Sequence, residues 1–504
     1  MSDIDTPSDH SSAPDTVAAL LPLDATGPAL LSVDGGVADH ETLRREVDRL
    51  AAQLRSAGLG PNSRFAIVLP NGPEMAFVLL AAMAVGCAAP LNPKYREDEF
   101  RFYLDDLHAS ALITLEGASP EALAAAPEGV IPITVRGEGL TIDLVVPFAG
   151  KSSMARPTAD DLALVLHTSG TTSRPKIVTL RQRNLARSAR NIASSLGLGA
   201  GDRSLNVMPL FHIHGMMAGL LGPLSVGGSV ACTPGFDAFA FHRWVDELHP
   251  TYYSAVPTMH QMVLARAPAP RPTTLRFVRS SSAALPASVS EGLRAQFDVP
   301  IIEAYGMTEA SHQMTSNPLP PGHVKPGSVG IASGIEVAIL DQENNVLPPG
   351  ERGEVSVRGA TILDGYENNP SANASAFTAG WFRTGDEGVL DEDGFLFLTG
   401  RLKEQINRGG EKISPIEIDE VLLRHPAVAE AVTFAIPHEK LGEEIGAVVV
   451  LTDGKEVTER ELRAYLGERL APFKVPRRIV FAAEIPKGAT GKVQRIGLAE
   501  KLSL

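Results

Sequence analysis

The stretch Leu162-Ala-Leu-Val-Leu-His-Thr-Ser-Gly-Thr-Thr-Ser-Arg-Pro-Lys176 joins a short apolar run to a loop rich in hydroxyl groups. Leu162–Leu166 has the length and composition of a buried strand. Backbone amides, hydroxyls and the Lys176 ammonium suit phosphate oxygens, whereas a plain polar surface loop is the alternative. The run does not fit the pattern GxxxxGK[ST], so a P-loop nucleotide-binding protein is disfavoured.

Short apolar runs recur on both sides of this stretch, with helical patterns between most of them. Leu43, Val47, Leu50 and Leu54 follow helical spacing, and a second helix is predicted from Pro73 to about Val85. Alternating strands and helices indicate an α/β fold with two mainly parallel sheets, whose ligands bind at the carboxyl ends of the strands. The predicted strands are Phe65–Leu69, Leu162–Leu166, Leu205–Met208, Ser229–Cys232, Tyr252–Val256, Leu275–Val278 and Ile301–Ala304.

The pattern changes twice towards the C-terminus. Residues 330–402 alternate apolar and polar positions between turn residues, which predicts a smaller antiparallel β subdomain. Residues 403–504 return to a compact α/β pattern that is long enough for a separate domain. We therefore expect a tail over residues 1–16, a large domain over 17–402 and a small one over 403–504.

Composition limits the classes of partner. The formal net charge of -14 argues against nucleic acid, and the acidic, Ser- and Pro-rich start lacks the features of a signal peptide. The longest apolar run, from Met75 to Leu91, is interrupted and too short for a membrane span. Cys87 and Cys232 lie in apolar runs with no disulfide or metal-ligand spacing. We expect a cytoplasmic protein without nucleic-acid or membrane partners.

Three further stretches carry chemistry. Glu303-Ala-Tyr-Gly-Met-Thr-Glu309 combines an aromatic ring, a glycine, a hydroxyl and a carboxylate after a predicted strand. Gly380-Trp-Phe-Arg-Thr-Gly-Asp386 ends in an Asp that suits ribose hydroxyls, although an Asp at a turn is usually a local cap. Pro486-Lys-Gly-Ala-Thr-Gly-Lys-Val-Gln-Arg495 contains lysines that are normally solvated. Each signal is modest by itself.

In this order and spacing, from about Leu43 to Arg495, the stretches resemble the adenylate-forming superfamily. That superfamily contains acyl-CoA synthetases, luciferases and peptide-synthetase adenylation domains. Two departures from its motifs stand out. Ser173 and Ile177 occupy positions of the phosphate loop where glycine is commoner, and 280–284 replaces a glycine-rich turn on the adenine side.

The resemblance implies an acid–CoA ligase that uses ATP, Mg²⁺ and coenzyme A, with a small C-terminal domain that rotates about a hinge at Lys403. Residues implied to hold the β- and γ-phosphates are Thr168, Ser169, Gly170, Thr171, Thr172 and Lys176. Residues implied around adenine, ribose and the α-phosphate are Ser282, Ala283, Ala284, Glu303, Tyr305, Gly306, Met307, Thr308, Asp386 and Arg401. Residues implied in catalysis are Lys492, Thr308 and the magnesium ligand Glu309, and those implied in the CoA tunnel are His212, Gly409 and Gly410.

The acid is predicted from three stretches that look like the oxalate–CoA ligase subgroup: 211–215, 279–285 and 307–312. His214, Ser282 and His312 are the expected acid-binding residues. An ordinary packing role for His312, as a brace of its loop, is the alternative. Other interpretations of the chain are a ligase for another small dicarboxylate, a fatty or an aryl acid, a carrier-protein-loading adenylation enzyme, and a non-catalytic nucleotide sensor.

Overall fold

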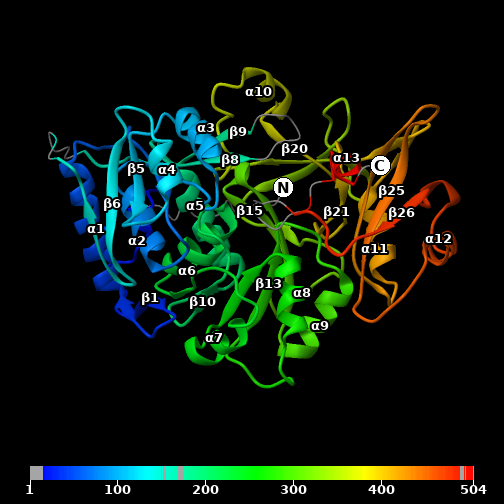
Figure 1. Cartoon of the computed structure of the whole chain (residues 1–504), viewed down its shortest axis with the longest axis horizontal. Coiled ribbons are helices and arrows are strands. Elements are labelled where there is room, and N and C mark those ends of the chain that lie inside the picture. The colour runs from blue at the N-terminus through cyan, green and yellow to red at the C-terminus, as the bar shows by residue number, and fades with distance from the viewer. Residues whose placement is uncertain are drawn as a thin grey trace, which may run out of the picture.

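Two large sheets of mainly parallel strands form the body of the protein (Figure 1). The computed structural model describes residues 15–148, 150, 155–168, 175–487, 493, 495–502 and 504. Within these residues the first sheet has the order β16-β15-β14-β13-β12-β10-β11-β1-β2, parallel from β14 to β1 and antiparallel at both ends. Its strands are β1 Pro28–Ser32, β2 Val37–Asp39, β10 Arg203–Asn206, β11 Ser229–Cys232, β12 Tyr252–Ala255, β13 Phe277–Ser281, β14 Ile301–Met307, β15 His312–Ser316 and β16 Ile331–Ala332.

The second sheet has the order β7-β6-β5-β3-β4-β8-β9 and lies at the left of Figure 1. It ends in an antiparallel hairpin of β8 and β9, so the hydroxyl-rich loop connects two paired strands. Its strands are β3 Arg64–Val68, β4 Cys87–Pro90, β5 Ala111–Leu115, β6 Ile131–Glu138, β7 Thr141–Val145, β8 Leu162–Thr168 and β9 Lys176–Arg181.

Helices pack on these sheets and share a hydrophobic core with their strands. The helix α2 is buried almost all round because its residues are nearly all apolar, whereas the amphipathic α1 is capped by Asp39, which accepts from the Thr42 N–H. The helical segments are η1 Ala18–Leu20, α1 His40–Ser56, α2 Pro73–Met83, α3 Glu97–Leu107, α4 Pro120–Ala124, α5 Gln182–Ser195, the π-helix η2 Gly215–Leu221, α6 Gly222–Leu224, α7 Phe241–Leu248, α8 Pro257–Ala265, α9 Ala287–Phe297 and η3 Thr308–Ala310.

An antiparallel sheet follows, as the alternating pattern predicts. Its order is β17-β18-β20-β19, with β21 paired to β20. Its elements are β17 Glu336–Leu340, β18 Arg352–Arg358, α10 Pro370–Ala376, β19 Phe377–Thr378, β20 Trp381–Leu390 and β21 Leu396–Arg401.

The C-terminal part forms a compact α/β unit at the right of Figure 1. Its core lies between its sheet and the helices α11 and α12, apart from the core of the large sheets. Its elements are β22 Ile406–Arg408, β23 Glu411–Ile413, α11 Pro415–Leu423, β24 Val428–His438, β25 Gly442–Leu451, α12 Glu459–Gly467, η4 Pro472–Lys474, β26 Arg478–Phe481 and α13 Leu498–Lys501.

The predicted α/β class is confirmed, and the differences lie at the ends of elements. Of the predicted tail, residues 1–14 lie outside the described residues, and Asp15 forms an ion pair with Arg190 on α5. The strand β13 continues to Ser281 and β14 to Met307, beyond the predicted ends. Among the described residues, no helix has the length and apolar character that a membrane span requires.

Candidate nucleotide and acid site

The β8–β9 hairpin presents the two ends of the hydroxyl-rich loop side by side. Thr168 and Lys176 are direct partners in its register. Ser169, Gly170, Thr171 and Thr172 lie outside the described residues. Ile177 pairs with His167 inside the hairpin. The position where the family more often has glycine is therefore ordinary strand backbone here, which a β-branched residue can adopt.

Lys176, Tyr366 and Glu309 form a cluster beside this hairpin. The Lys176 ammonium lies over the Tyr366 ring, 4.1 Å from its centroid. The Tyr366 hydroxyl donates to Glu309 Oε1 at 3.0 Å. Burial raises the pKa of Glu309. The hydrogen bond from Tyr366 and the charges of Lys176 and Arg401 lower this pKa, but they do not outweigh the burial. A single nearly buried carboxylate next to a lysine suits a cation that also binds phosphate oxygens.

The adenine-side and ribose-side motifs meet at Tyr305 and Asp386. The Tyr305 hydroxyl donates to Asp386 Oδ2, and the Arg401 Nε donates to Asp386 Oδ1 at 2.8 Å. The antiparallel register of β20 and β21 sets Asp386 directly opposite Arg401. Both motifs were expected in loops. Glu303–Met307 lie instead within β14 and Trp381–Asp386 within β20, which fixes the positions of Tyr305 and Asp386.

The rest of the β14 motif is tightly constrained. A Cβ at Gly306 would lie 1.7 Å from the carbonyl oxygen of His312, so only glycine fits between β14 and β15. Met307 ends the strand, and Thr308 and Glu309 form the short turn η3.

Glu303 is a largely buried carboxylate in the same strand. Its Oε2 accepts from the Leu285 N–H at 3.4 Å. Burial raises the pKa of Glu303 to about 7, with a further contribution from the charge of Glu420 on α11. Ala283 and Ala284 follow the turn after β13 and are exposed.

The acid-binding residues predicted from separate stretches converge around Arg279. The His214 and His312 rings stack with centroids 4.8 Å apart. Arg279 is fully buried and lies 3.3 Å from His214 Nε2 and 3.2 Å from His312 Nε2. It donates to Ser254 Oγ and to Gln313 Oε1, each at 2.9 Å. Burial lowers the pKa of Arg279 to about 10, at which the guanidinium remains a cation at neutral pH.

Ser282 completes this polar cluster. Its Oγ lies 3.1 Å from His214 Nδ1. Ser282 has φ +74° and His312 has φ +91°, so both adopt a conformation that side-chain-bearing residues rarely take. Such backbone strain in two polar residues of one cluster is typical of functional sites.

The remaining predicted residues are those assigned to the CoA tunnel, the hinge and catalysis. His212 lies on the same turn as His214 and its Nδ1 accepts from the His214 N–H at 3.2 Å. Gly409 and Gly410 form the turn of the β22–β23 hairpin, with φ +62° and +97°, which by itself favours glycine. Lys403 is exposed between β21 and β22. Lys492 lies outside the described residues.

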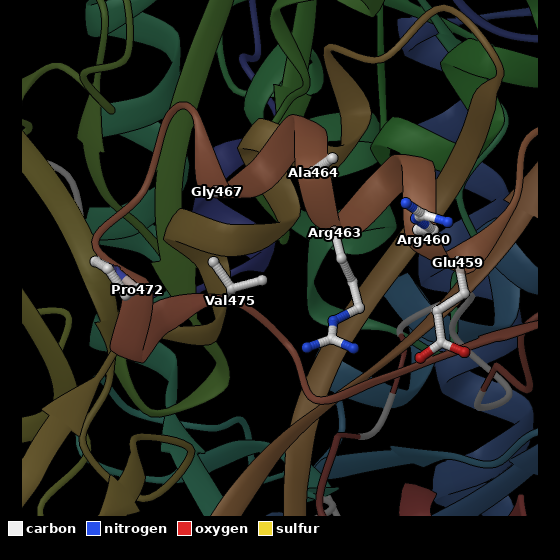
Figure 2. A pocket seen from close by; sticks show the side chains of 7 residues that line it. All are labelled: Glu459, Arg460, Arg463, Ala464, Gly467, Pro472 and Val475. Atoms are coloured by element: carbon white, nitrogen blue, oxygen red, sulfur yellow. The ribbon is translucent and has the colours of Figure 1, made fainter.

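A surface hollow of about 530 Å³ lies elsewhere, on α12 and the segment after it (Figure 2). Glu459, Arg463 and Val475 are among its lining residues. None of the residues that the sequence predicts for ATP or the acid lines it. Among the described residues there is also no group of three or more His, Cys, Asp or Glu side chains that would hold a metal ion alone.

Sequence reasoning missed Arg279, Ser254, Gln313 and Tyr366 as parts of the site. A charged residue directly after the apolar run Phe277–Val278 was the available signal for Arg279. In the structure this strand continues to Ser281, so the charge of Arg279 is buried within the sheet. Tyr366 had no comparable signal, because its role depends on the bridge between Val178 and Tyr366.

The sheets, the hairpin and the clustered motifs have the arrangement expected of a nucleotide-binding α/β enzyme. The pattern of the AMP-binding enzyme family matches residues 28–367, and that of the AMP-binding enzyme C-terminal domain matches residues 417–492.

Similar proteins agree with this class. An oxalate–CoA ligase of Arabidopsis thaliana is 45% identical over 472 residues, which cover 90% of this chain and 92% of that protein. An oxalate–CoA ligase of Saccharomyces cerevisiae is 41% identical over 504 residues, which cover 92% of this chain and 93% of that protein. The crystal structure of ATP-bound MatB from Rhodopseudomonas palustris has a TM-score of 0.86 at 28% identity. The match covers 97% of this chain and 99% of MatB. The chain belongs to the AMP-binding enzyme family, and it is an acid–CoA ligase.

The raised pKa of Glu303 predicts a pH-dependent stability. A folded-state pKa of about 7, above the ordinary value of 4.5, makes the fold lose stability as pH rises between these values. Glu303→Gln removes this group, so its Tm relative to the wild type should be higher at pH 8 than at pH 5. Calorimetry at both pH values checks this, with Glu291→Gln on α9 as the matched loss of one carboxylate. Equal Tm differences at both pH values would contradict the prediction.

Proposed function

We propose that this ligase joins oxalate to coenzyme A in two steps. A carboxylate oxygen of oxalate attacks the α-phosphorus of ATP and pyrophosphate leaves. The thiol of coenzyme A then attacks the acyl carbon, and AMP leaves. The observation that carries the acid assignment is the buried polar cluster of Arg279, His214 and His312, since a fatty or aryl acid needs an apolar wall instead.

The charge of the acid explains why such a cluster suits oxalate. After one carboxylate has been adenylated, the other remains an anion inside the protein. A buried anion costs several kcal/mol unless donors or a positive charge stabilise it. Ser282 and His312 would supply donors, and the Arg279 cation lies behind the two imidazoles. The homologous oxalate–CoA ligases support the same assignment.

The first step brings two anions together, so it depends on positioning and on electrostatic stabilisation. Glu309 would hold Mg²⁺, which offsets phosphate charge, and Tyr366 would orient that carboxylate. Thr168, the residues 169–172 and Lys176 would hold the β- and γ-phosphates. Thr308 would contact the α-phosphate, and Lys492 would bridge it to the carboxylate.

The nucleoside would lie along β14 and β20. Tyr305 would stack on adenine, with residues 282–284 along its other edge and the backbone from Glu303 to Met307 beside it. Asp386 would accept the ribose hydroxyls. The bonds that Asp386 now receives from Tyr305 and Arg401 support this role, because they hold the carboxylate in one orientation.

The second step would use a different placement of residues 403–504. Rotation about Lys403 would withdraw Lys492 and bring the Gly409-Gly410 turn towards a thiol tunnel that His212 borders. The open space around Gly410 supports a passage for the narrow pantetheine arm, because a Cβ added at this glycine would meet no atom within 4 Å.

An acid panel tests the substrate assignment. With ATP, Mg²⁺ and free CoA, kcat/KM for oxalate should exceed that for malonate at least about tenfold, because one methylene changes the fit of the second carboxylate. Acetate, octanoate and coumarate should react poorly. AMP release and thioester formation are both measured.

The same panel separates the alternatives. A fatty or aryl acid that outperforms oxalate would refute the substrate while leaving the ligase chemistry. AMP-forming activity without CoA thioester would favour a carrier-loading adenylation enzyme. ATP binding without AMP release for any acid would favour a nucleotide sensor.

A bulky side chain at Gly410 tests the second step. Gly410→Leu should leave oxalate-dependent ATP–pyrophosphate exchange intact and slow thioester formation at least about tenfold, because the side chain fills the path of the thiol. Gly454→Leu is the matched control, since Gly454 also has a positive φ of +71° and an added Cβ there would meet no atom within 4 Å. Equal thioester rates in the two variants would remove Gly410 from the tunnel.

A further inference from the structure

Arg279 is a fully buried cation, and no carboxylate of the described residues is among its hydrogen-bond partners. Its two terminal nitrogens reach Ser254, Gln313, His214 and His312, its Nε has no hydrogen-bond partner, and no ion pair with a carboxylate is found in the described part of the chain. A buried charge without a counter-charge is costly. Its retention at the centre of the acid-binding cluster therefore calls for a compensating anion, which a substrate can bring.

A guanidinium can only donate hydrogen bonds, and this restricts its histidine partners. The Nε2 atoms of His214 and His312 both face Arg279. An N–H at either Nε2 would face an N–H of Arg279, so these two contacts favour an unprotonated, accepting Nε2 on both rings. The proton of each neutral imidazole is then on Nδ1.

The contacts of Ser254 and Ser282 agree with this assignment. Ser254 accepts from Arg279, so its own hydroxyl hydrogen is available to donate to His214 Nε2 at 2.6 Å. On the other side of the ring, the Nδ1–H of His214 then donates to Ser282 Oγ. The Ser282 hydroxyl hydrogen consequently points away from His214.

We propose that Arg279 is a positioning residue for the acid, which fixes both histidines as Nδ1-protonated neutral imidazoles and so turns Ser282 and His312 into donors for the distal carboxylate. This inference rests on the proposed function for its substrate. The positive charge of Arg279, held behind the imidazoles, offsets the distal carboxylate. A monocarboxylic acid has no such charge, so the same cluster selects against it.

Gln313 offers a test that keeps Arg279 in place. In Gln313→Glu, a carboxylate replaces the amide whose Oε1 lies 2.9 Å from Arg279, while the hydroxyls of Ser195 and Ser333 can donate to its other oxygen. The local positive charge is thereby cancelled without leaving a cavity. The Tm should stay equal or rise, and KM for oxalate should rise at least about tenfold with KM for ATP little changed.

Deleting the guanidinium gives the complementary test. Arg279→Met should raise KM for oxalate without raising that for acetate, and so lower the preference for the dicarboxylate. Arg276→Met, which removes an arginine three residues earlier that pairs with Asp202, is the control for loss of one positive charge. Oxalate KM values equal to the wild type in Gln313→Glu and in a folded Arg279→Met would overturn the proposal.

A spectroscopic measurement on the wild type needs no variant of Arg279. Nitrogen-15 spectra of histidine-labelled protein, assigned with His214→Gln and His312→Gln, should show protonated Nδ1 and unprotonated Nε2 for both rings. A protonated Nε2 on either ring at pH 7 would overturn the assignment. Failure of the wild type to use oxalate would instead reject the proposed substrate, since the tautomers are read without it.

Discussion

The burial of the Arg279 guanidinium is the constraint on which the proposed acid-binding cluster depends. A charge that is fully removed from water needs polar partners, and five different side chains of this chain lie around the terminal nitrogens of Arg279 or against their partners. They come from β12, from the segment before η2, from the turn after β13 and from β15. Bringing these elements to one point requires the parallel order of β12, β13 and β14 and the antiparallel return of β15. The order and direction of the strands in this sheet therefore determine the polar cluster.

The nucleotide side depends on strand register in a similar way. The pairing of Asp386 with Arg401 follows from the alignment of β20 and β21, and that of Thr168 with Lys176 follows from the β8–β9 hairpin. Residues that are far apart in sequence, such as Lys176, Glu309 and Tyr366, then share one cluster. A rigid strand holds a side chain more precisely than a loop does, which suits a reaction that depends on positioning.

Much of this arrangement could be predicted from the sequence. Short apolar runs predicted the strands β3, β8, β10, β11, β12, β13 and β14. They could do so because a strand that is buried on both faces consists of continuous apolar residues. The motifs predicted His214, Ser282 and His312 together, and the structure brings them together. The ends of β13 and β14 were missed. Arg279–Ser281 are polar and Gly306 interrupts Tyr305–Met307, yet these residues are paired within the sheet. The partners Ser254, Gln313 and Tyr366 were also missed, since their positions follow from tertiary contacts that no local pattern encodes.

The most direct test of the central claim follows oxygen atoms from the acid. With oxalate labelled with oxygen-18 at all positions, attack of a carboxylate on the α-phosphorus, followed by thiol attack on the acyl carbon, leaves one labelled oxygen on AMP. Mass spectrometry of the products of wild-type enzyme with ATP and CoA should find one oxygen-18 in each AMP and none in pyrophosphate. Unlabelled AMP, or label in orthophosphate, would contradict an adenylate intermediate and with it the assignment of this site.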